Sequence, residues 1–177
     1  MRTVLPLKAV LLSIFSLLFM AMSVNIHASG LTDFEGNPKK IEDFTGNGKW
    51  TVVMFWASDC HVCNAEAHQY VAFQEKHKNG NIRMLGITLD GMSNKENFAA
   101  AKDFVKEHKL NFTNLIGEPE TIGALYYDMT GNFFAGTPTF MIFSPDKIVR
   151  AADAGAIPAA TIEEFIIEES VAKNEAE

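Results

Sequence analysis

The feature that most constrains this chain is the stretch VVMFWASDCHVCNAE at 52–66, where an apolar run changes into a helical pattern. It holds both cysteines of the chain, Cys60 and Cys63, with two residues between them. The pattern predicts a buried strand that ends just before Cys60 and a helix that begins at the pair. Because the first helical turn has N–H groups without an intrahelical acceptor, and the helix dipole favours negative charge there, this position favours a thiolate.

A cysteine pair at this spacing has three interpretations. A structural disulfide would stabilise little, since closing a loop of four residues is worth roughly 2 kcal/mol. A zinc half-site needs four ligands, and there is no second cysteine pair, although His61, His68 or His77 could contribute. A redox-active dithiol agrees with the predicted strand and helix, so we favour it and expect no metal. In that case Cys60 is the attacking thiolate, and Cys63, one turn into the helix, resolves the mixed disulfide.

His61, directly after the first cysteine, also has two interpretations. A protonated imidazole near the Cys60 sulfur would lower the pKa of that thiol and make the disulfide more oxidising. The alternative is a solvent-facing histidine with little effect on the cysteine. Both interpretations stay open on the sequence alone.

The first 28 residues have the pattern of a targeting segment. They contain two basic residues, no acidic residue and an apolar stretch at 9–22 that ends before a small-residue exit at Ala28. The stretch is short for a membrane-spanning helix, which needs about 20 residues. We therefore predict a signal peptide at 1–28, with an uncleaved membrane anchor as the alternative, and an exported domain at 29–177.

The charge and the predicted export limit the partners and the compartment. The chain has 22 acidic and 15 basic residues, and the predicted signal peptide takes two of the basic ones and none of the acidic ones. An acidic domain without a basic stripe is not expected to bind nucleic acid. In the periplasm or cell envelope disulfides persist, so a dithiol that must stay reduced needs a dedicated electron donor.

The rest of the chain alternates between predicted strands and helices. The strand at 50–56 has no polar face, so we expect it in the middle of a sheet. Thr161 is the predicted N-cap of the last helix, with acidic residues in its first turn, and the last five residues are predicted to be a frayed tail. The order predicts one α/β domain with a mixed central sheet covered by helices on both faces. Strands are expected at 50–56, 82–89, 112–116, 139–143 and 148–150, an N-terminal hairpin at 31–41, and helices at 62–77, 95–109, 120–127 and 161–172.

Pro138 lies directly before the strand at 139–143, in the sequence GTPTFMIF. From its own residues it is expected to be a trans turn proline, since only about one X–Pro bond in twenty is cis. The combination of FWASDCHVCNAE and GTPTFMIF, however, resembles the thioredoxin superfamily. Within it, the chain is similar to the exported, often membrane-tethered thiol-disulfide oxidoreductases of the TlpA, ResA and DsbE group. The hairpin, a strand-helix insert at 87–117 and the closing hairpin share the resemblance, which covers 31–168.

This resemblance implies a thioredoxin-like fold and roles for several residues. It implies that Cys60 is the nucleophile and Cys63 the resolving thiol. It further implies that Pro138 is cis and faces the dithiol, and that Thr137 offers its backbone to a substrate peptide. We place Trp56 and His61 in the same substrate-binding set, and Trp56 is also expected to support the active-site loop from the strand end.

Glu66 matches an acidic residue that the group often has three positions after the second cysteine. In a helix it lies one turn beyond Cys63 and can face the same cleft. A half-buried carboxylate there could move protons to and from the thiols. The alternative is an ordinary solvated glutamate of the helix surface.

The resemblance also implies protein substrates with disulfides or thiols, a membrane thiol-disulfide electron donor and no cofactor, and we expect a monomer. Reduction of substrates, such as apocytochrome c, is favoured over oxidation. Two departures leave the direction of electron flow open: Met54 stands where thioredoxin has a buried aspartate, and the dipeptide His61-Val62 lacks the usual proline. The alternatives are a disulfide-forming oxidant and a metal- or partner-binding protein without turnover. A thiol peroxidase is disfavoured because the only cysteines are those of the pair.

Overall fold

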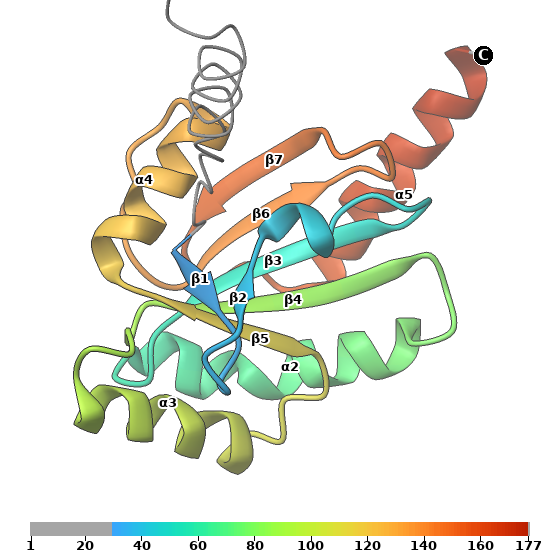
Figure 1. Ribbon diagram of the computed structural model, residues 1–177. Coiled ribbons are helices and arrows are strands. Elements are labelled where there is room, and N and C mark those ends of the chain that lie inside the picture. Colours follow the sequence, from blue (N-terminus) through green and yellow to red (C-terminus); the bar gives the residue numbers. More distant parts are fainter. Residues whose placement is uncertain (1–29, 177) are drawn as a thin grey trace, which may run out of the picture.

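The computed structural model describes residues 30–176, and the predicted signal peptide at 1–28 lies outside the described residues (Figure 1). Every predicted strand and helix of the domain is present, within a few residues of its expected ends. The strands are β1 (Leu31–Thr32), β2 (Pro38–Lys39), β3 (Trp50–Trp56), β4 (Ile82–Thr88), β5 (Thr113–Gly117), β6 (Thr139–Phe143) and β7 (Val149–Ala154). The helices are the short 3-10 helix η2 (Ile41–Asp43), α2 (His61–His77), α3 (Lys95–Glu107), α4 (Pro119–Thr130) and α5 (Ala159–Ala176).

The strands form one mixed sheet in the order β2-β1-β5-β4-β3-β6-β7. Strands β3, β4 and β5 run parallel to one another, whereas β1 and β6 pair antiparallel with β5 and β3. All seven residues of β3 are buried, and the strand lies between β4 and β6. The central position predicted for 50–56 and the mixed sheet are therefore confirmed.

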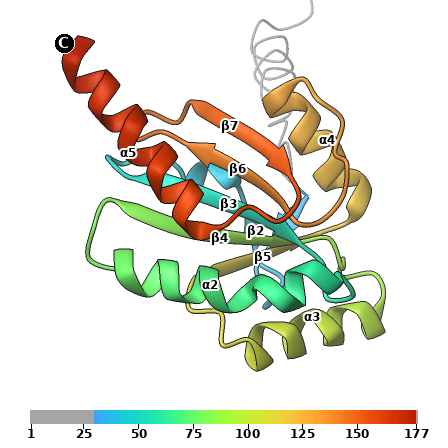
Figure 2. The same cartoon turned by 180° about the vertical axis from the view of Figure 1, so that it is seen from behind.

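Alternate residues of β3 serve the two faces of the sheet, as the two-residue period of a strand requires. Trp50, Val52, Met54 and Trp56 pack with buried residues of α2, α3 and α5, whereas Val53 and Phe55 pack with buried residues of α4 on the other face. Figures 1 and 2 show the two layers of helices on either side of the sheet. The strand therefore has no polar side because both of its faces are covered by helices.

The last helix differs from the prediction at both ends. It begins at Ala159, directly after Pro158, whose carbonyl accepts a hydrogen bond from the Ile162 N–H at 3.2 Å. Thr161 therefore lies inside the helix and is not its N-cap, and the first turn has no acidic residue. The helix also continues to Ala176, so the predicted frayed tail is wrong. The alanine, glutamate and lysine residues of this end are good helix formers, and this preference extends the helix.

Within 30–176, no helix has the length and apolar character needed to cross a lipid bilayer.

Candidate active site

Strand β3 ends at Trp56, and the chain then passes into α2 (Figure 1). The two cysteines lie at the start of this helix. Cys60 is the N-cap residue of α2, and its sulfur accepts a hydrogen bond from the Cys63 N–H at 3.1 Å. The two sulfurs form a disulfide, with the Cα atoms 5.2 Å apart. Cys63 is fully buried, whereas Cys60 is half-buried. Cys60 is thus the more accessible residue of the pair, and the roles of nucleophile and resolving thiol stay predictions.

The loop before Cys60 is bound to the end of the neighbouring parallel strand. Asp90 follows β4, and its carboxylate accepts hydrogen bonds from the Ser58 N–H at 3.0 Å and from the Ser58 hydroxyl at 2.7 Å. The Thr88 hydroxyl donates to the same carboxylate. The sequence reasoning missed Asp90. Its position directly after a buried strand was a usable signal, because the carboxyl ends of parallel strands meet at one edge of the sheet.

Trp56, the last residue of β3, supports this loop from the end of the strand. Its side chain is completely buried, its ring stacks on Phe104 with 4.4 Å between centroids, and its indole N–H donates to Asn114 Oδ1 at 3.1 Å. A side chain without exposed surface cannot contact a substrate. Trp56 is therefore a supporting residue, and its placement in the substrate-binding set is corrected.

The segment that leads into β6 lies at the same edge of the sheet and consists of Gly136, Thr137 and Pro138. Strand β6 pairs with β3 so that Thr139 lies opposite Phe55, which places the residues before β6 beside the end of β3. The Thr137–Pro138 peptide bond is cis, as the resemblance implied and contrary to the expectation from the residues alone. The Pro138 carbonyl accepts from the Gly155 N–H at 2.8 Å. The Thr137 N–H and C=O have no hydrogen-bond partner within 30–176, so they are available to a bound peptide.

Glu66 and His61 are in different surroundings. His61 is exposed at the first position of α2. Glu66 is half-buried and accepts a hydrogen bond from the Gln69 side chain, whose carbonyl in turn accepts from the Ala159 N–H at 2.8 Å. Burial, with a smaller contribution from the charge on Glu66, raises the pKa of Tyr70. Glu66 of α2 is thus linked through Gln69 to the start of α5, and its role in proton transfer stays a prediction.

The zinc interpretation gains no support from the neighbouring histidines. The His68 ring lies 3.0 Å from the Ala65 carbonyl of its own helix, and His77 Nε2 lies 3.3 Å from the Glu163 carboxylate near the far end of α2. Residues 30–176 contain no group of three or more His, Cys, Asp or Glu side chains arranged to hold a metal ion.

A family model described as the AhpC/TSA family matches residues 24–152, which is more than half of the chain. The chain belongs to this family. A curated relative, the sporulation thiol-disulfide oxidoreductase A of Bacillus subtilis (strain 168), is 22% identical over 118 residues, which are 67% of this chain and 67% of the relative.

Solved structures show the same fold. A thiol:disulfide interchange protein of the thioredoxin family from Chlorobium tepidum TLS has a TM-score of 0.62 and 20% identity, over 77% of this chain and 89% of that chain. StoA from Bacillus subtilis has a TM-score of 0.59 and 21% identity, over 77% and 96%. A secreted Mycobacterium tuberculosis disulfide oxidoreductase homologous to E. coli DsbE has a TM-score of 0.55 and 25% identity, over 76% and 88%. The predicted thioredoxin-like fold and enzyme class, a thiol-disulfide oxidoreductase, are confirmed.

Proposed function

We propose that this protein is an exported oxidoreductase that reduces disulfides of other proteins in the periplasm or cell envelope. The observation that carries the proposal is the disulfide-bonded Cys60–Cys63 pair at the entrance of α2, in which Cys60 is half-buried and Cys63 is fully buried. The backbone N–H and C=O of Thr137, which have no hydrogen-bond partner within 30–176, support it, because an extended peptide can hydrogen-bond to them near the end of β3. The segment 1–28 would direct export, as a cleaved signal peptide or as an anchor.

The reaction would transfer two electrons through a mixed disulfide. The Cys60 thiolate attacks one sulfur of the substrate disulfide, forms a new S–S bond and releases the other substrate sulfur as a thiolate. The Cys63 thiolate then attacks Cys60, which releases the second substrate sulfur and leaves the Cys60–Cys63 disulfide. A membrane thiol-disulfide electron donor would return the enzyme to its dithiol by the same two steps in reverse. Glu66 would pass protons to and from the thiols.

The acidic residue directly before Cys60 supports reduction as the direction. Asp59 is exposed directly before the nucleophile, and it lines a pocket with Asp103 and Glu107 of α3. Negative charge near a thiol raises its pKa and disfavours the thiolate. A strong oxidant of this kind owes its potential to a stabilised reduced form, so negative charge that offsets part of the thiolate stabilisation from the N-terminus of α2 moves the pair toward reducing potentials. His61 is the one side chain of the dipeptide that opposes this effect when protonated.

Replacement of the resolving cysteine tests the mechanism. A Cys63→Ala variant in its native envelope should accumulate mixed disulfides through Cys60 that dithiothreitol releases, because the second attack is lost. The double variant Cys60→Ser, Cys63→Ala is the matched control and should trap nothing. If thiol turnover in Cys63→Ala equals that of the wild type, and the wild type binds zinc or copper stoichiometrically, the enzyme mechanism is excluded in favour of a binding protein.

The equilibrium reduction potential tests the direction. We expect a value below that of the cytosolic glutathione pool, about −220 to −260 mV by extraction. A value near that of DsbA, about −120 mV, would assign the protein to disulfide formation instead.

A further inference from the structure

Every polar group of Ser58, two residues before the nucleophile, is hydrogen-bonded. The Ser58 N–H and hydroxyl donate to the Asp90 carboxylate. The Ser58 carbonyl accepts a hydrogen bond from the Asn64 side-chain amide at 3.0 Å. The same Asn64 amide nitrogen donates to the Cys60 carbonyl at 2.9 Å. One side chain on the first turn of α2 therefore bridges two carbonyls of the active-site loop.

The hydrogen-bond capacity of Asn64 determines the role of its third partner. A primary amide has two N–H donors and one carbonyl acceptor, and the two carbonyls of Ser58 and Cys60 use both donors. The Asn64 Oδ1 atom must therefore accept, and His108 Nε2 lies 3.0 Å from it. His108 Nε2 consequently carries a proton in this contact, whether the ring is neutral or protonated. The contact does not depend on the charge of His108.

His108 connects the loop to the aromatic residues beneath it. It is the C-cap residue of α3, and its ring packs on Phe104 with 4.3 Å between centroids. Phe104 stacks in turn on Trp56, the last residue of β3 before the loop. Direct contacts thus connect the loop to Phe104 in two ways. One runs through Trp56 at the end of β3, and the other runs through Asn64 and His108.

We propose that Asn64 and His108 are positioning residues for the nucleophile. By holding the carbonyls of Ser58 and Cys60, they keep the Cys60 sulfur at the N-cap of α2, next to the Cys63 N–H and the positive end of the helix dipole. These groups stabilise the thiolate form of Cys60 in the reduced enzyme. The proposal rests on the proposed function, since it assigns the two residues to the reactivity of the same dithiol.

Two substitutions of His108 separate the hydrogen bond from the aromatic packing. His108→Phe keeps a ring against Phe104 and removes the N–H donor, whereas His108→Gln keeps an N–H donor and removes the ring. The measurement is the rate of Cys60 alkylation by iodoacetamide in the reduced protein from pH 5 to 9, which gives the Cys60 pKa. His68→Phe is the matched control, because His68 is an exposed histidine of α2 whose ring lies within hydrogen-bond distance of the Ala65 carbonyl of its own helix.

His108→Phe should raise the Cys60 pKa and slow alkylation at pH 6 by about fivefold, the effect of one lost hydrogen bond. His108→Gln should stay within about twofold of the wild type, and His68→Phe should match it. Asn64→Leu, which loses three hydrogen bonds at once, should slow alkylation more than His108→Phe does. The unfolding midpoint of each variant is also measured by circular dichroism. A purely structural role would change this midpoint and leave the pH profile of Cys60 alkylation unchanged.

An unchanged pH profile in both His108→Phe and Asn64→Leu would overturn the proposal, as would a His108→Gln variant as slow as His108→Phe. Trapping by Cys63→Ala is measured separately in the otherwise unchanged chain. Failure of the positioning proposal therefore leaves mixed-disulfide formation intact, whereas failure of the proposed function removes it.

Discussion

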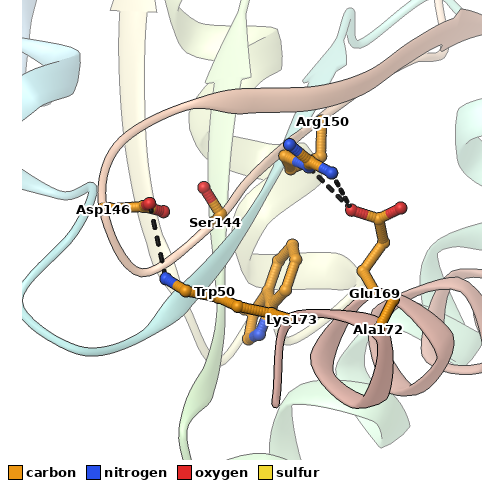
Figure 3. A pocket seen from close by; sticks show the side chains of 7 residues that line it. All are labelled: Trp50, Ser144, Asp146, Arg150, Glu169, Ala172 and Lys173. Atoms are coloured by element: carbon orange, nitrogen blue, oxygen red, sulfur yellow. Dashed lines mark hydrogen bonds and ion pairs between the residues drawn. The ribbon is translucent and has the colours of Figure 1, made fainter. Parts of the chain in front are cut away.

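The two ends of β3 both carry a buried tryptophan, but different interactions surround them. At the Trp50 end, a pocket of about 340 Å³ is lined by two ion pairs, Arg150 with Glu169 and Lys173 with Asp146 (Figure 3). At the Trp56 end, the indole and the loop that follows are held by a network of hydrogen bonds that includes the Asp90 carboxylate.

The difference shows how the Trp56 end, which leads to the cysteines and which we call the reactive end, is kept in place. The side chains of the Lys173–Asp146 pair are about half exposed, at 51% and 49%, and such pairs contribute roughly 0–1 kcal/mol. The two ion pairs join α5 to the β6–β7 hairpin, and their side chains can shift position at little cost in free energy. The indole N–H of Trp56 is buried, and leaving such a donor unpaired costs about 1–3 kcal/mol. The end with the cysteines therefore tolerates far less displacement than the end with the ion pairs.

Gly86→Ala should give the largest effect, because it acts at the reactive end. A Cβ at Gly86 would overlap Asn114 Oδ1 and lie 2.9 Å from Trp56 Nε1, which would separate the two groups. We expect a loss of about 3 kcal/mol in the free energy of unfolding, measured with urea, and reduced disulfide reductase activity.

Gly123→Ala is the matched control for that substitution. Gly123 lies inside α4, and a Cβ there would meet no other element of the described chain, 30–176, within 4 Å. Alanine should therefore stabilise the helix by about 0.5–1 kcal/mol. Equal effects of the two alanines would contradict the contrast between the ends of β3.

Glu118→Gln should have an intermediate, pH-dependent effect at the reactive end. Burial opposes ionisation of Glu118, but hydrogen bonds from the Ser93 and Met92 N–H groups and from the Ser93 hydroxyl lower its pKa below the usual 4.5. A lowered pKa in the folded state gives stability that is present above pH 4.5 and lost as the pH falls through the folded-state pKa. The variant should be less stable than the wild type by about 1 kcal/mol at pH 7.

Urea unfolding at pH 7 and at pH 3 checks this dependence. The difference between Glu118→Gln and the wild type should shrink at the lower pH. A difference that grows toward acid would show that the Glu118 carboxylate does not stabilise the loop after β4.

Arg150→Gln should give the smallest effect, because it acts at the ion-paired end. The Arg150 guanidinium donates to Glu169 Oε2 at 2.7 Å, but its side chain is 44% exposed. We expect a loss of about 0.5 kcal/mol at low salt that largely disappears in 1 M NaCl, with unchanged reductase activity. A loss as large as that of Gly86→Ala would make the two ends equivalent.

The sequence predicted those parts of the fold and site that depend on local pattern. The apolar run of β3 and the position of Cys60 at the start of α2 follow from residues adjacent in the chain. Asp90 and His108 could not be found in this way, because they reach the loop only through the register of parallel strands and the orientation of α3. The cis bond before Pro138 required the family resemblance, since its residues alone favour trans.

The N-terminal hairpin has a consequence for how molecules of this protein meet each other. Strand β1 covers the open side of β5, and the outermost strand on that side, β2, has only two residues, the first of which is Pro38. A proline has no N–H to donate, and so short a strand offers little for another chain to extend. The hairpin thus closes this border of the sheet against strand addition and aggregation, and leaves β7 as the longer exposed border.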